Sequence, residues 1–128
     1  MEKIQNYMAE SLLTISPTAT VLEASHMMND NEIHSLLVEE GGEYIGIITN
    51  HDISKKLVGD NLDPNKVPVS EVMSFPLIKM ECQESMEKAA QVMRDHSIHH
   101  IAVTEHGQML GTLFINDYHK YLVLKHPK

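Results

Sequence analysis

The chain has 128 residues, which fits one compact domain able to bury a core without disulfide bonds. Its hydrophobic share of 42% is close to that of ordinary globular proteins and argues against disorder. A net charge of −8 with a single arginine, Arg94, excludes a basic nucleic-acid-binding footprint. The single cysteine, Cys82, excludes an internal disulfide and favours a reducing, cytoplasmic location. No apolar stretch suits a signal peptide or a membrane span, so we expect no membrane insertion.

The chain contains an internal duplication. The segment GIITNHD recurs as GTLFIND, with glycine and aspartate at the same offset and a separation of 65 residues (117 − 52 = 65). At this separation residues 4–58 overlay residues 69–123 without a gap. A gapless match of this length indicates two copies of one supersecondary unit. We therefore predict a first repeat at residues 1–60, a linker at 61–68 and a second repeat at 69–128.

The first repeat shows five elements in order. LLTI (residues 12–15) is a short apolar run that suits a strand. A helix is predicted from Val21 to Asn31, because Thr20 and Glu23 make a capping-box pattern and apolar residues follow at helical spacing. The segment SLLVEEGGEYIGIIT then predicts a strand, a turn at its two glycines and a second strand. A short helix is predicted at Asp52–Val58.

The second repeat has the same order of elements. A helix is predicted from Met86 to Arg94, preceded by Ser85, and a final helix at Asp117–Leu124. HIAVTEHGQMLGTLF repeats the strand-turn-strand pattern of the first copy. The predicted class is therefore α/β (α+β), with two β-α-β-β-α repeats. Neither copy buries much surface alone, so we expect the copies to share a core through a pseudo-twofold axis.

The ordered motifs of the two repeats resemble those of paired CBS (cystathionine-β-synthase) domains, also called a Bateman module. They are MAESLLTISPTATVLEASHMM, IHSLLV and GIITNHD, each with a counterpart in the second copy. The resemblance implies regulation by ligand binding rather than catalysis. The ligands it implies contain adenosine: AMP, ADP, ATP, S-adenosylmethionine, and in some members NAD or a cyclic dinucleotide. No P-loop, nucleophile elbow or paired-carboxylate motif suggests an enzyme.

The resemblance also implies roles for the residues of the first motif. Asp52 would accept hydrogen bonds from the ribose hydroxyls, and Thr49 would lie near phosphate. A carboxylate can hold two cis hydroxyls, and the start of a helix favours an anion. An alternative is that Asp52 and Asp117 are only helix N-caps. In the family the ligand lies between the repeats, so the expected site comprises Asp52, Thr49, Ile47, Ile78, Met80, Ile98, His99 and His100.

The second motif departs from the first. Phe114 replaces the hydroxyl of Thr49, which makes a phosphate beside Asp117 less favourable and lets the ring fill the pocket. The second, weaker site comprises Asp117, Leu13, Ile15, Ile33 and His34. At the first site, the groups expected near phosphate suit a mono- or diphosphate better than a triphosphate. These groups are His99, Lys55, Lys56 and Lys79.

Other readings of the sequence have less support. The cluster HSIHH contains His99 and His100, but its spacing matches no closed zinc set, so no metal site is predicted. A sensor that uses these histidines with Cys82 stays a minor alternative. The nine methionines are explained by core packing. The main alternative is a ligand-independent dimerisation or scaffold module with filled pockets. The resemblance further implies a homodimer through the outer helices and an effector protein that the sequence does not identify.

Overall fold

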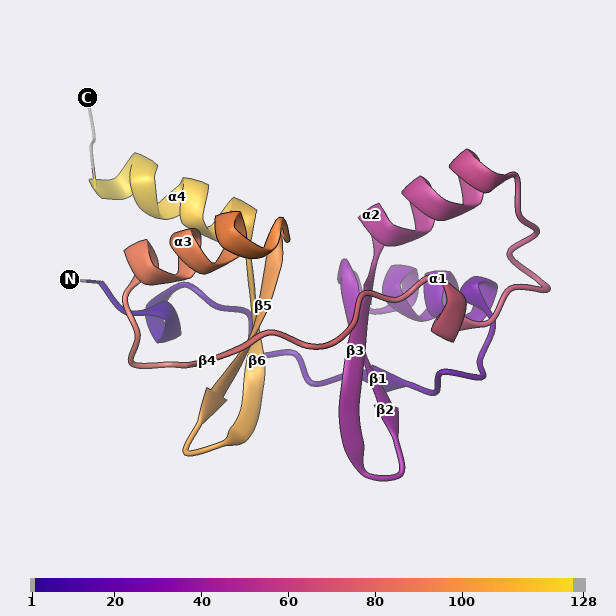
Figure 1. Ribbon diagram of the computed structural model, residues 1–128, viewed down its shortest axis with the longest axis horizontal. Helices are drawn as coiled ribbons and strands as arrows, with labels where there is room; N and C mark the ends of the chain where they lie inside the picture. Colours follow the sequence, from indigo (N-terminus) through magenta and orange to yellow (C-terminus); the bar gives the residue numbers. More distant parts are fainter. Residues whose placement is uncertain (1, 126–128) are drawn as a thin grey trace. The chain divides into compact units, whose positions relative to one another are not determined.

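The structure is a computed structural model and describes residues 2–125. The chain forms two compact units (Figure 1). The first-repeat unit is Leu13–Leu77. The second-repeat unit combines Met1–Leu12 with Ile78–Lys128.

Each unit contains the predicted β-α-β-β-α series. In the first-repeat unit the elements are β1 (Thr14–Ile15), α1 (Val21–Asp30), β2 (Ser35–Glu40), β3 (Glu43–Thr49) and α2 (Asn50–Ile53), followed by a π-helical turn (Ser54–Val58) and a 3₁₀ turn (Val69–Glu71). In the second-repeat unit they are a 3₁₀ turn (Ile4–Asn6), β4 (Lys79–Glu81), α3 (Met86–His96), β5 (His100–Glu105), β6 (Gln108–Phe114) and α4 (Ile115–Lys125). The predicted mixed α/β class with two repeats is confirmed.

The two sheets have the same topology. β1 pairs parallel with β2, and β2 pairs antiparallel with β3; β4, β5 and β6 repeat this arrangement. The predicted turn at Gly41–Gly42 is confirmed, and both glycines have the positive φ that such a turn requires. Each hairpin also has one register shift, after Val38 in the first sheet and after Val103 in the second, again 65 residues apart (103 − 38 = 65). The duplication therefore extends to backbone irregularities.

Local side-chain chemistry sets the helix starts. The Thr20 Oγ1 accepts from the Glu23 backbone N–H at 3.1 Å, and the Glu23 carboxylate accepts from the Thr20 backbone N–H at 3.0 Å. The predicted capping box is therefore confirmed. The Ser85 hydroxyl caps α3 by accepting from the Lys88 backbone N–H at 3.1 Å. In Figure 1, α3 and α4 lie together on one side of the β4–β6 sheet.

The first strand is shorter than predicted. The run at residues 12–15 predicts a four-residue strand, but the strand that pairs in register with β2 is Thr14–Ile15, and Leu13 adds only its carbonyl, which accepts from the Leu37 backbone N–H at 3.1 Å. Leu12 and Leu13 are 43% and 41% exposed, so their apolar character does not reflect burial in a sheet. An apolar run alone therefore does not show where a strand begins.

The segments that begin the repeats are exchanged between the units. Ala9, from the start of the first repeat, makes two backbone hydrogen bonds of 2.9 Å with Thr112 of β6. Ser74, from the start of the second repeat, makes the matching bonds with Ile47 of β3 at 2.8 and 3.1 Å. The predicted domain boundaries follow the repeat in sequence. The compact units instead join each leading segment to the sheet of the other repeat.

The predicted linker also packs in the first-repeat unit. Val67 is buried, and its carbonyl accepts from the Val21 backbone N–H at 2.9 Å. The Pro64 carbonyl accepts from the Leu22 backbone N–H at 3.0 Å. These bonds satisfy two of the N–H groups that the first turn of α1 leaves without helical partners.

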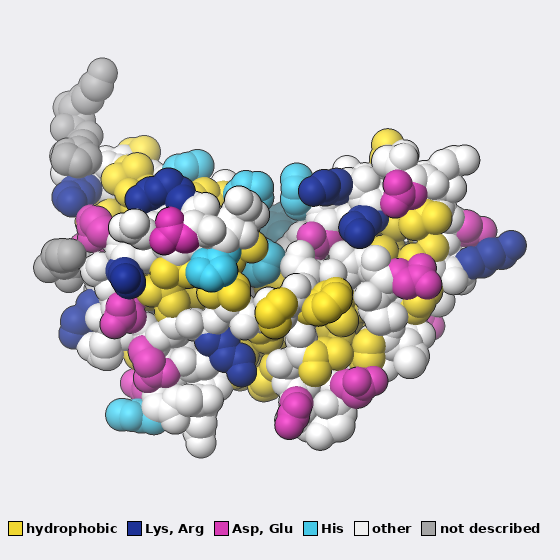
Figure 2. Space-filling view, in the orientation of Figure 1, with side chains coloured by type: hydrophobic (Ala, Val, Ile, Leu, Met, Phe, Trp, Pro, Cys, Tyr) yellow, Lys and Arg dark blue, Asp and Glu magenta, His cyan; other side chains and the backbone are white. Residues whose placement is uncertain are grey.

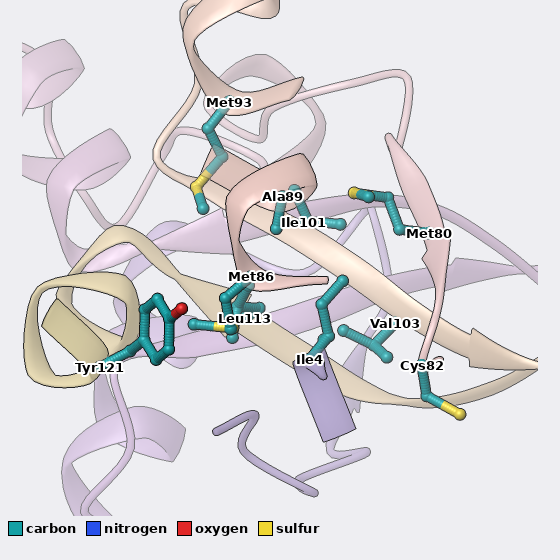
Figure 3. Packing of buried hydrophobic residues seen from close by; sticks show 10 residues of the cluster. All are labelled: Ile4, Met80, Cys82, Met86, Ala89, Met93, Ile101, Val103, Leu113 and Tyr121. Carbon is teal, nitrogen blue, oxygen red and sulfur yellow. The ribbon is translucent and has the colours of Figure 1, made fainter. Parts of the chain in front are cut away.

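The core of the second-repeat unit lies between its sheet and its helices (Figure 3). α3 supplies Met86, Ala89 and Met93, and α4 supplies Tyr121. Figure 3 shows the Tyr121 ring facing the side chains of Met86 and Leu113. The full cluster is Ile4, Met80, Cys82, Met86, Ala89, Met93, Ile101, Val103, Leu113 and Tyr121.

The prediction that methionines fill the core is confirmed. Met28, Met86 and Met93 are each at most 1% exposed, and Met27 packs against the core of the first-repeat unit. Unbranched, flexible methionine side chains fill irregular gaps between a helix and a sheet. Cys82 is 1% exposed and is a member of the apolar cluster in its unit.

The β5–β6 hairpin is held by a carboxylate that the first repeat lacks. Glu81 accepts from the Thr104 hydroxyl, from the His106 backbone N–H at 2.8 Å and from the Gly107 backbone N–H at 3.3 Å. The Thr104 hydroxyl and then the His106 N–H hold the pKa of Glu81 below its ordinary value of 4.5. Ser16 occupies the corresponding position in the first repeat (81 − 65 = 16).

We expect Glu81→Gln to lower the thermal unfolding midpoint near neutral pH, because it removes the charge from these hydrogen bonds. A carboxylate with a lowered folded pKa stabilises the fold above its unfolded pKa, and this contribution is lost as pH falls through the folded value. The difference from wild type should therefore shrink as pH drops below about 4.5. Thermal scans from pH 3 to 7 test this, with Glu43→Gln in the other hairpin as the control. Parallel pH profiles for the two variants would contradict the expectation.

Candidate ligand-binding site

The first motif forms a capping box at the end of β3. Thr49 has an extended backbone and is the N-cap of α2, and its Oγ1 accepts from the Asp52 backbone N–H at 3.0 Å. The Asp52 Oδ2 accepts in return from the Thr49 backbone N–H at 3.0 Å. The prediction that the helix begins at Asp52 is wrong: it begins at Asn50, and Asp52 is its third residue. The N-cap alternative for Asp52 is wrong for the same reason, since Thr49 takes that position.

The other Asp52 oxygen has a partner that the sequence analysis missed. The Ser74 hydroxyl donates to the Asp52 Oδ1 at 2.9 Å. Ser74 reaches Asp52 because its own backbone pairs with Ile47 on β3. The overlay of the repeats contained one signal, since it places Ser74 opposite Ala9 (74 − 65 = 9), which has no hydroxyl.

The second motif keeps its aspartate in a different environment. The Asp117 Oδ2 accepts from the Phe114 backbone N–H at 2.8 Å, but Phe114 has no oxygen to complete a capping box. Burial raises the pKa of Asp117, and the Phe114 hydrogen bond and the charge of Lys120 only partly oppose this. The Phe114 ring lies 6.4 Å from the His100 ring, centroid to centroid. The final helix begins at Ile115 and not at Asp117 as predicted, so Asp117 is also its third residue.

The remaining residues predicted for the Asp52 site lie within three strands or in the residues that directly precede them. Ile47 is in β3 and is fully buried. Ile78 directly precedes β4, and Met80 lies within it. Ile98 and His99 are in the turn before β5, and His100 is its first residue, 9% exposed. These last five residues belong to the second-repeat unit, so their grouping with Asp52 stays a prediction.

The predicted second site is divided in the same way. Asp117 lies in the second-repeat unit, and the other four predicted residues lie in the first-repeat unit. Two of them, Ile33 and His34, border a hollow of about 540 Å³. The His34 Nδ1 is 3.3 Å from the Asn50 Nδ2. Leu13 and Ile15 lie at β1. The hollow is lined by Ser25, Met28, Asn29, Glu32, Ile33, His34 and Asn50.

Charged side chains of both signs are mixed on the face of the molecule shown in Figure 2, where Lys and Arg are interspersed with Asp and Glu. Within residues 2–125, no three His, Cys, Asp or Glu side chains are placed to hold a metal ion together. Over the same residues, no helix has the length and apolar character to cross a membrane.

The chain belongs to the CBS domain family, whose model matches residues 4–59 and 69–124. It is therefore a tandem CBS pair, a class of regulatory module. A CBS domain-containing protein of Bacillus subtilis, YhcV, is 29% identical over 117 residues, which are 91% of this chain and 83% of that protein. The hexameric CBS-CP12 protein from bloom-forming cyanobacteria shares 27% identity with a TM-score of 0.87, covering 99% of this chain and 72% of that one.

Two further proteins resemble this chain over only part of their length or only in their fold. A homoserine O-acetyltransferase of Methanosphaera stadtmanae is 30% identical over 113 residues, but the chain spans only 22% of that enzyme. The CBS domain pair of protein MJ0100, solved with 5′-methylthioadenosine and S-adenosyl-L-methionine, has a TM-score of 0.81 over 98% of each chain. With 21% sequence identity, this structural similarity shows a shared fold.

Proposed function

We propose that this CBS pair senses an adenosine-containing ligand and transmits its occupancy to a partner protein. The observation that carries the proposal is the Asp52 carboxylate, which is half-buried and oriented by the Thr49 N–H and the Ser74 hydroxyl. A carboxylate has about four acceptor positions, so two remain for the cis hydroxyls of a ribose. The MJ0100 pair supports the ligand class, since a protein of this fold holds two adenosine compounds.

Thr49 supports a ligand that also carries phosphate. Its Oγ1 uses a lone pair to accept from the Asp52 N–H, so the hydroxyl proton can be donated to a phosphate oxygen. Lys55 and Lys56 are exposed on the π-helical turn that continues α2 and can supply positive charge. These groups favour AMP or ADP over ATP. The assignment of the base to Ile78, Met80, Ile98, His99 and His100 stays a prediction from the family resemblance.

The second motif favours a different use of the Asp117 region. Phe114 removes the hydroxyl, and its ring lies against His100. Burial raises the pKa of Asp117, so this carboxylate loses its charge at a higher pH than an ordinary aspartate does. The Phe114 ring supports the alternative function, a scaffold whose pockets are filled by side chains.

Exposed apolar side chains support the predicted homodimer. Val123 and Leu124 on α4 are 69% and 68% exposed, and Val58 on the π-helical turn is 79% exposed. Burial of such side chains against a second copy would be favourable. Sedimentation equilibrium measures the mass independently of shape, and a monomer at all concentrations would reject the homodimer.

Asp52→Ala tests the proposed function. Without the carboxylate the ribose hydroxyls lose their acceptor, so we expect the stabilisation by ligand to disappear. For wild type, a ligand at about 100 times its Kd adds roughly 2.7 kcal/mol and raises the unfolding midpoint by several degrees. Thermal unfolding with AMP, ADP, ATP, S-adenosylmethionine and NAD measures this shift.

Two variants serve as controls for Asp52→Ala. Asp52→Asn keeps an oxygen for the Thr49 N–H but has lost the negative charge, and Asp60→Ala removes an exposed aspartate beyond the π-helical turn. We expect Asp60→Ala to respond to ligand as wild type does. If wild type responds to none of the five compounds, the scaffold function is favoured. An equal response from Asp52→Ala would remove Asp52 from the site.

A further inference from the structure

Ser74 is held in a fixed place by its backbone. Its N–H donates to the Ile47 carbonyl at 2.8 Å, and its carbonyl accepts from the Ile47 N–H at 3.1 Å. Gly46 lies beside this pairing and has no side chain to hold the two backbone segments apart. An added Cβ would lie 2.8 Å from the Ser74 carbonyl oxygen. Only the Ser74 side-chain rotamer remains to be set, and its hydroxyl is directed to the Asp52 Oδ1 at 2.9 Å.

The second repeat contains the same backbone arrangement without the hydroxyl. Ala9 pairs with Thr112 as Ser74 pairs with Ile47, and Asp117 accepts from the Phe114 N–H as Asp52 accepts from the Thr49 N–H. The serine is thus not needed to build the strand pairing or to hold the aspartate at its helix. Its specific contribution is a second, charge-assisted hydrogen bond to one of the two aspartates.

We infer that Ser74 is a positioning residue that orients the Asp52 carboxylate for the cis-diol of a ribose. The inference rests on the proposed function and deepens it. With Thr49 on one oxygen and Ser74 on the other, rotation of the carboxylate is blocked at both ends, and its remaining lone pairs keep one direction. Orientation before binding removes part of the entropy cost of forming two hydrogen bonds to the ligand. Ser74 therefore contributes to selectivity for ribonucleotides over deoxyribonucleotides.

The test compares AMP with 2′-deoxy-AMP by isothermal titration calorimetry on the full chain. We expect Ser74→Ala to weaken AMP binding by up to roughly tenfold, because the Asp52 carboxylate must then be ordered on binding. We also expect its preference for AMP over 2′-deoxy-AMP to fall below that of wild type. Ser74→Thr keeps the hydroxyl and should restore both quantities. Ser70→Ala removes an exposed serine from the neighbouring 3₁₀ turn and should behave as wild type.

The outcomes separate this inference from the proposed function. If Asp52→Ala abolishes binding but Ser74→Ala binds AMP as tightly as wild type or more tightly, the inference is overturned and the proposed function stands. If Ser74→Ala weakens both nucleotides by one factor, the serine is only structural and the inference is again overturned. If wild type binds AMP too weakly to measure, ATP and 2′-deoxy-ATP replace the pair. If wild type binds neither AMP nor ATP, the inference is overturned. The wider panel of adenosine compounds then tests the proposed function.

Discussion

Replacing Gly111 by alanine is expected to lower the free energy of unfolding by roughly 3 kcal/mol or more. A Cβ at this position would lie 2.0 Å from the Ala9 carbonyl oxygen and 3.0 Å from its carbonyl carbon. Both atoms belong to the backbone, so no side-chain rotation relieves the clash. The segment must move away from β6, which breaks the two hydrogen bonds between Ala9 and Thr112. Urea unfolding with linear extrapolation measures the loss.

Two other glycines provide matched comparisons for Gly111→Ala. Gly59→Ala is the control, because an added Cβ meets nothing within 4 Å and the φ of −62° is helical. We expect it to be neutral or to stabilise slightly. Gly46→Ala should fall between the two, since its Cβ would lie 2.8 Å from the Ser74 carbonyl oxygen and 3.0 Å from the flexible Met73 Sδ. Equal stability of Gly111→Ala and Gly59→Ala would show that the Ala9 segment does not pair with β6 in solution.

Truncating Leu113 to alanine is expected to cost about 2–5 kcal/mol of unfolding free energy. Leu113 is fully buried on β6 and lies among Met86, Ile101 and Tyr121 of the core (Figure 3). The loss combines the transfer of its removed carbons to water with the cavity that α3 and the sheet cannot fill. Denaturant unfolding measures it under the conditions used for the glycine variants.

Leu12→Ala is the control for the truncation of Leu113. It makes the same substitution in the same unit, but Leu12 is 43% exposed. We expect a change within about 0.5 kcal/mol. A loss below about 1 kcal/mol for Leu113→Ala would mean that the core relaxes around the missing side chain, and it would contradict the packing shown for this unit.

The sequence by itself determined the duplication, the order of elements and the starts of α1 and α3. The capping box of Thr20 and Glu23 and the turn at Gly41–Gly42 were predictable because each depends on residues within one turn of chain. The methionines were assigned to the core because helical spacing places them on one face. The family resemblance rests on the same local motifs, and the CBS match confirms it.

Only the tertiary structure decided which segment completes which sheet. Backbone hydrogen bonds carry no sequence signal, so nothing in the pattern around Ala9 indicates that it pairs with Thr112, far along the chain. This pairing and its counterpart between Ser74 and Ile47 explain the repeated glycines. Gly111 and Gly46 lie where another backbone approaches too closely for a Cβ. The pairing of Ser74 with Ile47 also brings the Ser74 hydroxyl to Asp52, which is 22 residues earlier in the sequence. Local chemistry thus determines the elements, whereas contacts between distant segments determine how the candidate site is held.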